Sequence, residues 1–280
     1  MTLTPFIYLA VSAVAFGAMA IFARFAYAGG ADVLGVLVAR FSIAGAVLAL
    51  LMLATRRPWP RGRALGVAIG MGAIGYVGQA ACYFAALNHA SAGLVALLLY
   101  VYPTLVCLLA AAFLGDRLTR RTLALLAVSF AGIALTLGGG HGTAIGFALA
   151  LGGALFYSVY IVVGARELKG TDPLAATTVI CLAAAATLLF ASLWRTPQFP
   201  TAAGGWIPVI LIALVSTVLA ILAFFAGLKR VGAATASIVS TLEPVVTVVL
   251  AWLVLGESLA AIQVLGAVLV LGSAAWLARG

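Results

Sequence analysis

The chain has 280 residues, of which 66% are hydrophobic and only 8% are Asp, Glu, Lys or Arg. A soluble domain carries about 25% of such charged residues, so the composition excludes a soluble enzyme, a disordered chain and a secreted disulfide scaffold. It predicts an integral membrane protein with little mass outside the bilayer. The net charge of +9 does not indicate a nucleic-acid partner, because the basic residues stand in short runs between apolar segments.

Ten apolar segments follow one another along the chain, each close to the roughly 20 residues that a helix needs to cross a bilayer. Short stretches that contain Gly, Asn or charged residues separate them, including one at 229–232. Only helices of this length satisfy every backbone group inside the membrane. We therefore expect an all-α fold of ten transmembrane helices, covering residues 5–28, 33–55, 64–87, 91–114, 121–138, 144–165, 173–194, 206–228, 232–255 and 259–278.

The basic residues indicate the orientation of these spans. If the N-terminus is cytoplasmic, twelve Lys and Arg residues fall on the cytoplasmic side and only Arg195 falls outside. Cytoplasmic loops carry an excess of Lys and Arg, so we expect both termini in the cytoplasm of a cell with a bacterial-type inner membrane. Arg24 and Arg40 lie within the first two spans, toward the outer leaflet. They either attract a substrate carboxylate at the outer mouth or, as we prefer, snorkel and pair with neighbours such as Asp32.

Six tyrosines lie well inside spans three, four and six, away from the span ends where aromatic belts occur. A buried phenol needs a hydrogen-bond partner, which favours a wet or ligand-filled cavity; ordinary helix packing with local hydroxyl bonds is the alternative. Spacing also places a glutamine on the tyrosine face of span three. We expect these side chains to bind small apolar or aromatic solutes, and the candidates are Tyr76, Gln79, Tyr83, Tyr100, Tyr102, Tyr157 and Tyr160.

Span nine carries a second group of substrate-binding candidates, Ser240, Thr241 and Glu243. Ser and Thr can instead bond to their own backbone. Glu243 is the one acid near a span centre, where a charge costs at least about 2.5–3.5 kcal/mol. Three roles stay open for it, namely binding a substrate amine, carrying a proton, or remaining protonated and hydrogen-bonded.

Prolines stand near the middle of spans four and nine. Proline lacks an N–H and crowds the carbonyl four residues before it, so Pro103 and Pro244 are expected to kink or loosen their helices at the midplane. Such breaks are useful in a cavity wall, where water or substrate can satisfy the freed carbonyls. We predict a hinge at both residues; simple curvature for packing is the alternative.

The two halves of the chain repeat each other at a shift of 141 residues. Leu-Gly-Asp-Arg-Leu at 114–118 aligns with Leu-Gly-Glu-Ser-Leu at 255–259, and Pro103 aligns with Pro244. The first repeat is expected over residues 1–140 and the second over 144–280, with five spans each. An odd number of spans turns the second repeat upside down. Inverted repeats are typical of transporters whose site lies at the midplane and opens alternately to either side.

In the Gly-acid pairs at 115–116 and 256–257, Gly suits a helix end and the acid suits the start of the next helix.

These motifs also carry a family resemblance. Ser-Ala-Gly-Leu at 91–94, the Tyr102-Pro103 step and the Leu-Gly-acid motif resemble the first-repeat signature of the EamA family, in the drug/metabolite transporter superfamily. Leu-Glu-Pro-Val at 242–245 resembles the second-repeat signature, and Arg40 resembles the arginine of the family's second helix. Within the family the chain is most similar to YddG-type aromatic amino acid exporters. The resemblance implies export by alternating access through a cavity lined by spans 1, 3, 4, 6, 8 and 9. Where many members have Trp, this chain has Phe16 and Tyr157.

The sequence offers little for catalysis. The two histidines lie in connectors, and paired carboxylates, metal-ligand spacings and phosphate-binding loops are missing. We expect no enzymatic activity, no cofactor and no metal, and the three cysteines are interpreted as small buried side chains. The expected partners are the bilayer and a small-molecule substrate, with a monomer as one possibility. The alternatives to an amino acid exporter are a passive channel-like facilitator and an exporter of drugs or nucleoside-type metabolites.

Overall fold

The computed structural model describes residues 4–114, 120–138, 142–240 and 242–277, and over these ranges it contains helices and no strand. The predicted all-α fold is confirmed. Seven helical stretches in the described ranges are long and apolar enough to cross a membrane: Thr4–Ala28, Val33–Ala54, Gly62–Ala86, Ala92–Phe113, Ala144–Glu167, Pro173–Ala191 and Ala203–Leu228. Shorter apolar segments, Leu123–Leu135, Leu242–Leu255 and Ala261–Ser273, lie within the other three expected spans. The number of ten spans stays a prediction.

The first half of the chain folds into α1 (Thr4–Gly17), α2 (Met19–Ala28), α3 (Val33–Ala54), α4 (Gly62–Gly70), the π-helical η1 (Met71–Tyr76), α5 (Val77–Ala86), α6 (Ala92–Leu99), α7 (Tyr102–Leu114) and α8 (Arg120–Gly138). The second half folds into α9 (Ala144–Glu167), α10 (Pro173–Ala191), α11 (Ala203–Ala213), the π-helical η2 (Leu214–Leu219), α12 (Ala220–Ser240), α13 (Leu242–Leu255) and α14 (Ala261–Leu277). A π-helical segment thus interrupts the third helical stretch of each half, and such segments are frequent at functional sites.

Side-chain caps explain where four of these helices begin. Asp32, Ser91, Thr143 and Asp172 each accept a hydrogen bond from the backbone N–H three residues ahead, at the start of α3, α6, α9 and α10. A cap of this kind satisfies one of the N–H groups that have no partner within the helix. The beginnings of these helices therefore follow directly from the sequence.

The helix of span four breaks near its proline. α6 ends at Leu99 and α7 begins at Tyr102, so the interruption lies just before Pro103. It falls where this proline crowds the carbonyl four residues earlier, at Leu99. In the second half, residue 241 lies outside the described residues, so the expected kink at Pro244 stays a prediction.

One expected boundary is wrong. A loop is expected at 229–232 from the sequence, but α12 runs without a break through these residues, from Ala220 to Ser240. Lys and Arg are good helix formers and a single glycine costs only about 1 kcal/mol inside a helix. The Arg230 guanidinium also donates to the carbonyl of Ala226 at 3.0 Å, one turn back. A short basic run with one glycine therefore does not end this helix.

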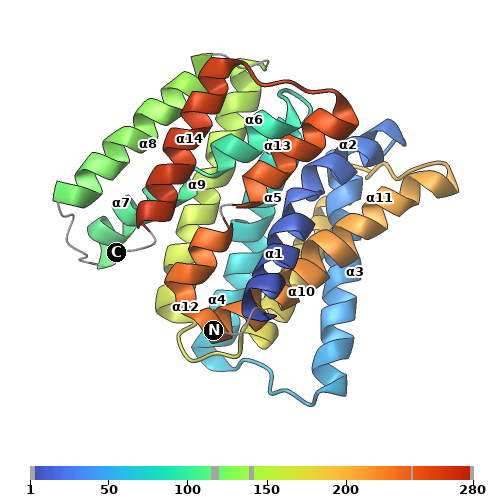
Figure 1. The fold of residues 1–280 in the computed structure, drawn as a ribbon. Helices are drawn as coiled ribbons and strands as arrows, with labels where there is room; N and C mark the ends of the chain where they lie inside the picture. The colour runs from blue at the N-terminus through green and yellow to red at the C-terminus, as the bar shows by residue number, and fades with distance from the viewer. Residues whose placement is uncertain (1–3, 115–119, 139–141, 241, 278–280) are drawn as a thin grey trace.

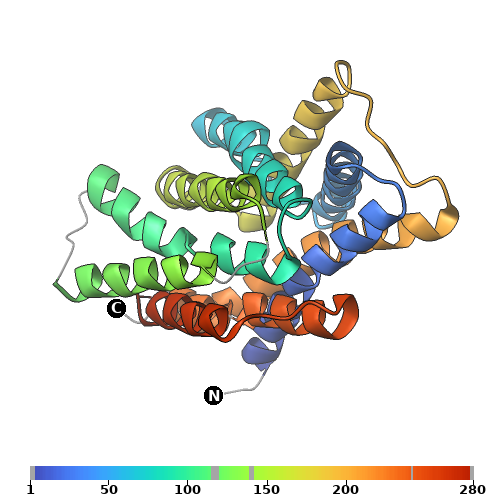
Figure 2. The same cartoon turned by 90° about the horizontal axis from the view of Figure 1, so that it is seen from above.

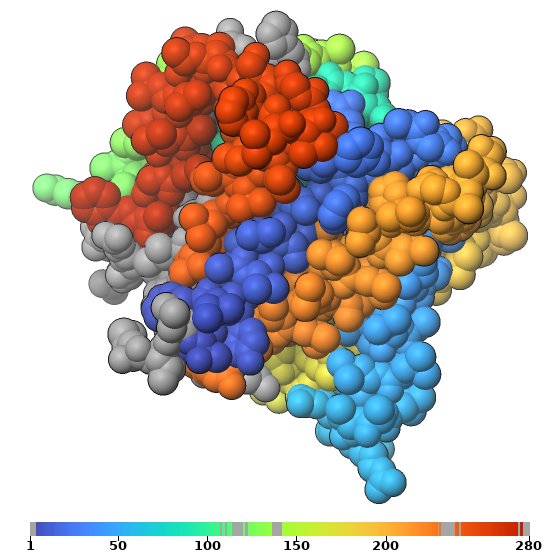
Figure 3. Space-filling view, turned by 45° about the vertical axis from the view of Figure 1, so that its right-hand side comes forward, coloured from blue at the N-terminus to red at the C-terminus, as the bar shows by residue number. Residues whose placement is uncertain are grey.

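The two halves pack across each other. α1 contacts α12 and α13 of the second half, and α9 contacts α5, α6 and α7 of the first. Corresponding helices also meet, α3 with α10 and α8 with α14. Figures 1 and 2 show α8 and α14 side by side at one end of the molecule. On the face in Figure 3, α1 and α2 lie between α11 on one side and α13 on the other.

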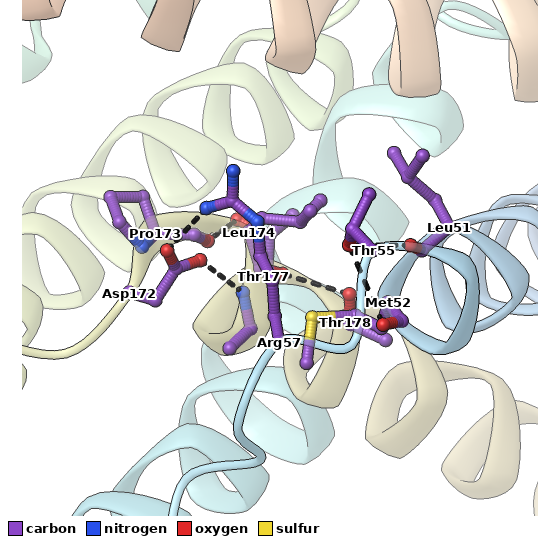
Figure 4. A network of polar contacts seen from close by, with 10 residues as sticks. Leu51, Met52, Thr55, Arg57, Asp172, Pro173, Leu174, Thr177 and Thr178 are labelled. Carbon is purple, nitrogen blue, oxygen red and sulfur yellow. Dashed lines mark hydrogen bonds and ion pairs between the residues drawn. The ribbon is translucent and has the colours of Figure 1, made fainter.

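Two ion pairs join the ends of α3 and α10. Asp32, at the start of α3, lies 3.6 Å from the guanidinium of Arg195, which follows the end of α10. Asp172, at the start of α10, accepts a hydrogen bond of 2.5 Å from Arg57, which follows the end of α3. Figure 4 shows Arg57 reaching Asp172 beside the first turn of α10. Because the start of each helix meets the end of the other, α3 and α10 run antiparallel.

Candidate functional site

A cavity of about 270 Å³ lies between the two halves, with walls from α1, α2, α3, η1, α5, α6, α7, α9, α10, α12 and α13. The structure places on its wall every described residue that the sequence analysis proposed for substrate binding: Tyr76, Gln79, Tyr83, Tyr100, Tyr102, Tyr157, Tyr160, Ser240 and Glu243. Thr241 lies outside the described residues. Pro103 and Pro244 are not among the wall residues; each lies one turn or less into the helix that begins beside the cavity.

Five of the tyrosine rings form a continuous aromatic wall, which we call the tyrosine arc (Tyr100, Tyr102, Tyr157, Tyr160 and Tyr76). Successive ring centroids are separated by 5.5, 4.7, 6.0 and 5.8 Å along this order. These spacings are typical of favourable aromatic contacts. The arc combines Tyr76 of η1, Tyr100 between α6 and α7, and Tyr102 of α7 with two residues from α9, so both halves contribute to it. It gives the cavity a largely apolar surface with hydroxyl groups.

Glu243 lies at one end of the tyrosine arc. The Tyr100 hydroxyl donates to the carbonyl of Ser240 at 2.5 Å and lies 3.0 Å from Oε2 of Glu243. A phenol carries one hydrogen, so it cannot donate fully to both oxygens. If Glu243 is protonated and donates to Tyr100, all three groups are satisfied. The contact therefore fits the protonated alternative for Glu243 as well as the ionised one.

Close packing of α1 against α13 sets the position of Glu243. The Thr247 hydroxyl donates to the carbonyl of Gly17 at 2.8 Å. A Cβ atom at Gly17 would lie 2.7 Å from the carbonyl oxygen of Glu243, closer than real Cβ atoms approach. Glycine at this position allows the two backbones to touch, which brings the start of α13 to the cavity.

Arg40 lies at the other end of the tyrosine arc, deep in the protein. It is 2% exposed; Nε donates to Thr217 Oγ1 and Nη2 to Tyr76 Oη, both at 3.0 Å. The expectation that it pairs with Asp32 is wrong, because Asp32 caps α3 and pairs with Arg195. A residue seven positions into a helix lies about 10 Å from its end, which is too deep for snorkelling and is the signal that the sequence analysis undervalued.

Two phenylalanines, Phe16 and Phe224, also line the cavity. Phe224 was not predicted, and Phe16 was named only as a position where many family members have Trp, although the repeat contained the signal for both. At the shift of 141 residues they are the counterparts of Tyr157 and Tyr83, two of the predicted tyrosines. Applying the repeat to each tyrosine would have found them. Thr177 of α10 also lines the cavity, and nothing in the sequence pattern distinguishes it.

A second cross-half contact lies at the start of α6. The Glu257 carboxylate accepts hydrogen bonds from the N–H groups of Ala92 at 2.9 Å and Gly93 at 3.2 Å. Arg24 lies 3.7 Å from Glu257 and donates to the carbonyl of Ala90 at 2.8 Å, so its partner is not Asp32. The acid was expected at the start of its own next helix, but it caps a helix of the other half. The matching pair at 115–116 lies outside the described residues.

Across the described ranges, no group of three or more His, Cys, Asp or Glu side chains is arranged to hold a metal ion. Cys82 and Cys181 are free, the first half-buried and the second buried. The cavity therefore offers hydroxyls, one carboxyl group, one guanidinium and aromatic rings. This set suits binding a solute.

Comparison with known proteins identifies the family. The model of the EamA-like transporter family matches residues 3–138 and again 144–279. YcbK of Bacillus subtilis (strain 168), described as an uncharacterized transporter, is 30% identical over 279 residues, covering 93% of this chain and 88% of its own length. YyaM of the same organism, described in the same way, is 29% identical over 245 residues, covering 83% and 80%.

One solved crystal structure, 24% identical, covers 100% of this chain and 99% of its own with a TM-score of 0.70, so the two share a fold. The resemblance to the EamA family is confirmed, whereas the YddG-type assignment within it stays a prediction. The seven long apolar helical stretches of this chain make it a multi-pass membrane protein. Since the family model matches both halves, the chain belongs to the EamA-like transporter family.

Proposed function

We propose that this transporter exports small amino acids or related metabolites, preferably aromatic or hydrophobic ones, through the cavity between its halves. The observation that carries the proposal is the tyrosine arc, a wall of adjacent rings between a carboxyl group and a guanidinium. Aromatic side chains of a solute can pack against such rings, while Glu243 is available to bind an amine. The YddG-type resemblance in the sequence supports the amino acid class.

Alternating access between two inverted repeats is the proposed mechanism. Three observations support it: the family model matches once in each half, each half has a π-helical segment in its third stretch, and α3 and α10 run antiparallel. The proposal includes ten spans in repeats of residues 1–140 and 144–280, with both termini cytoplasmic in the inner membrane, as the distribution of basic residues favours. The interruption before Pro103 and the expected kink at Pro244 are the proposed hinges, and the protein is proposed to work as a monomer.

The function is tested by uptake into proteoliposomes that contain the purified protein. We expect saturable uptake of aromatic amino acids, and counterflow when the vesicles are preloaded with the same solute. A carrier gives counterflow because loaded sites return faster, whereas a passive channel does not. Uptake without saturation or counterflow would contradict alternating access, and uptake of nucleosides or drugs but not amino acids would replace the substrate class.

Cavity variants connect this uptake to the proposed site. Tyr83→Ala and Tyr100→Ala are expected to lower uptake of bulky substrates because both rings line the cavity. Phe113→Ala is the matched control, since this aromatic residue is 69% exposed and lies near the end of α7. Equal losses in all three folded variants would show that the cavity tyrosines are not a special set.

A further inference from the structure

A positive charge without an acidic partner lies in the cavity wall at Arg40. Its two hydrogen-bond acceptors among the described residues are the neutral hydroxyls of Thr217 and Tyr76. The ion pairs found in the described ranges involve other arginines, and none places a carboxylate within 4.0 Å of Arg40. Arginine cannot be deprotonated in proteins, so the site keeps its charge. Buried charges are normally paired, which leaves a place for a negatively charged group.

The guanidinium has donors left for such a group. Arginine carries five N–H groups in a planar fork, and the bonds to Thr217 and Tyr76 use one on Nε and one on Nη2. The fork matches the two oxygens of a carboxylate, which it commonly binds through two parallel hydrogen bonds. A solute carboxylate can therefore bind Arg40 while the bonds that orient the side chain are kept.

The surroundings of Arg40 strengthen its attraction for an anion. The guanidinium carbon lies 5.0 Å from the ring centroid of Phe41, 5.4 Å from that of Tyr76 and 5.5 Å from that of Phe84. These rings stabilise the cation through cation–π contacts, but they are neutral and leave its charge uncompensated. Arg40 is also buried, and a charge acts more strongly where the dielectric constant is low.

Charge and size narrow the anion to a small monocarboxylate. The cavity of about 270 Å³ is smaller than the roughly 300–1,000 Å³ of drug-sized pockets. Glu243 lines the same cavity at the other end of the tyrosine arc, so a second negative group on the solute would approach an acid. A solute with one carboxylate at Arg40 and an apolar or aromatic body along the tyrosine arc pairs with the charge at the Arg40 end and brings no negative group to Glu243 at the other end.

We propose that Arg40 is the carboxylate-binding residue of the transport site and that the substrates are small monocarboxylates with an apolar or aromatic body, amino acids included. The inference rests on the proposed transport function and specifies its substrate class. Arg40 belongs to the first half and bonds to Tyr76 of η1 and Thr217 of η2. A carboxylate bound there contacts the residue that links the π-helical segments of both halves.

The test compares two solutes that differ only in the carboxylate, L-phenylalanine and L-phenylalaninamide, in proteoliposomes with wild-type protein, Arg40→Gln and Arg40→Lys. Losing a charge-assisted bond lowers affinity by about 10- to 100-fold. We expect Arg40→Gln to lower uptake of phenylalanine by about that factor at low concentration and to leave uptake of the amide within about twofold. Arg40→Lys keeps the positive charge but lacks the planar fork, so its uptake of phenylalanine is expected to lie between that of wild type and that of Arg40→Gln. Arg61→Gln, at an exposed arginine outside the cavity, is the matched control.

Equal losses for both solutes in folded Arg40→Gln protein would overturn the proposal, and so would unchanged uptake of both. If Arg40→Gln does not fold, inhibition of wild-type uptake decides: 3-phenylpropionate is expected to inhibit and 3-phenylpropionamide is not. If wild-type protein transports neither phenylalanine nor its amide, the proposed amino acid transport is contradicted, but the carboxylate site at Arg40 is not. The site is then tested by thermal unfolding in detergent, where 3-phenylpropionate should raise the midpoint of wild type, raise that of Arg40→Lys by less, and leave that of Arg40→Gln unchanged. No difference between the proteins in that measurement overturns the proposal.

Discussion

Removing the Glu257 carboxylate should destabilise the protein, because this side chain caps α6 from the opposite half. It accepts from the N–H groups of Ala92 and Gly93 at 2.9 and 3.2 Å, and hydrogen bonds to a charged group contribute about 1.5–3 kcal/mol each. The ion pair with Arg24 adds little, about 0.2–1 kcal/mol, since its atoms are 3.7 Å apart and both side chains are partly exposed. Allowing for non-additivity, we expect Glu257→Ala to cost about 3 kcal/mol and Glu257→Gln, which keeps one acceptor oxygen, about 1 kcal/mol.

Thermal unfolding of the purified protein in detergent, followed by tryptophan fluorescence, measures this cost. By the scaling for chains of 150–250 residues, a loss of about 3 kcal/mol lowers the midpoint by about 6–12 °C. Ser258→Ala, at the exposed neighbouring residue, is the control and should shift the midpoint by less than about 2 °C. The reasoning is refuted if Glu257→Ala unfolds at the temperature of Ser258→Ala, or if Glu257→Gln loses as much as Glu257→Ala.

Three further predictions concern topology, pH and proton coupling. In a cysteine-free background, a cysteine at Ala203 should react with an impermeant reagent on intact cells and one at Lys169 should not; the reverse pattern contradicts cytoplasmic termini. Burial opposes ionisation of Asp172, but the N–H of Ala175 and the Arg57 guanidinium outweigh it and lower its pKa below the usual value. The contribution of the ionised Asp172 to the stability of the folded protein is therefore present at neutral pH and is lost as the pH falls through that lowered pKa. Asn also caps helices, so Asp172→Asn should cost at most about 1 kcal/mol at pH 7 and nothing in strong acid, and an equal cost at both pH values would be inconsistent with an ion pair. Glu243→Gln should abolish stimulation of uptake by a pH gradient if this residue carries a proton, while unchanged uptake with and without the gradient shows that it does not.

Much of the fold follows from local rules that the sequence displays. Apolar length defines the long helices, and the caps at Asp32 and Asp172 define where two of them begin. The tyrosines on the cavity wall could be predicted because a phenol inside an apolar span has few other reasons to be there. The helix interruption before Pro103 could be predicted because the missing N–H of proline acts within one turn.

What the sequence analysis missed depends on contacts between residues far apart in the chain. The partners of Arg40 come from two other elements, η1 and η2, so they cannot be read from span two alone. Glu257 follows one helix but caps another, 165 residues away. The helix through 229–232 continues because weak breakers such as a single glycine are overruled by helix formers on both sides. Local patterns give such cases no distinct signal.

The two ion pairs at the ends of α3 and α10 have a consequence for the origin of the chain. Asp32 pairs with Arg195, and Asp172 pairs with Arg57. Each half therefore contributes one aspartate and one arginine to the two ion pairs. This is the isologous arrangement of a symmetric homodimer, in which one patch is complementary to itself. A polypeptide of half this length, carrying one capping aspartate and one arginine after its second helix, would form both bonds with an upside-down copy of itself. Fusing two such copies then preserves a subunit interface as the interior of a single protein.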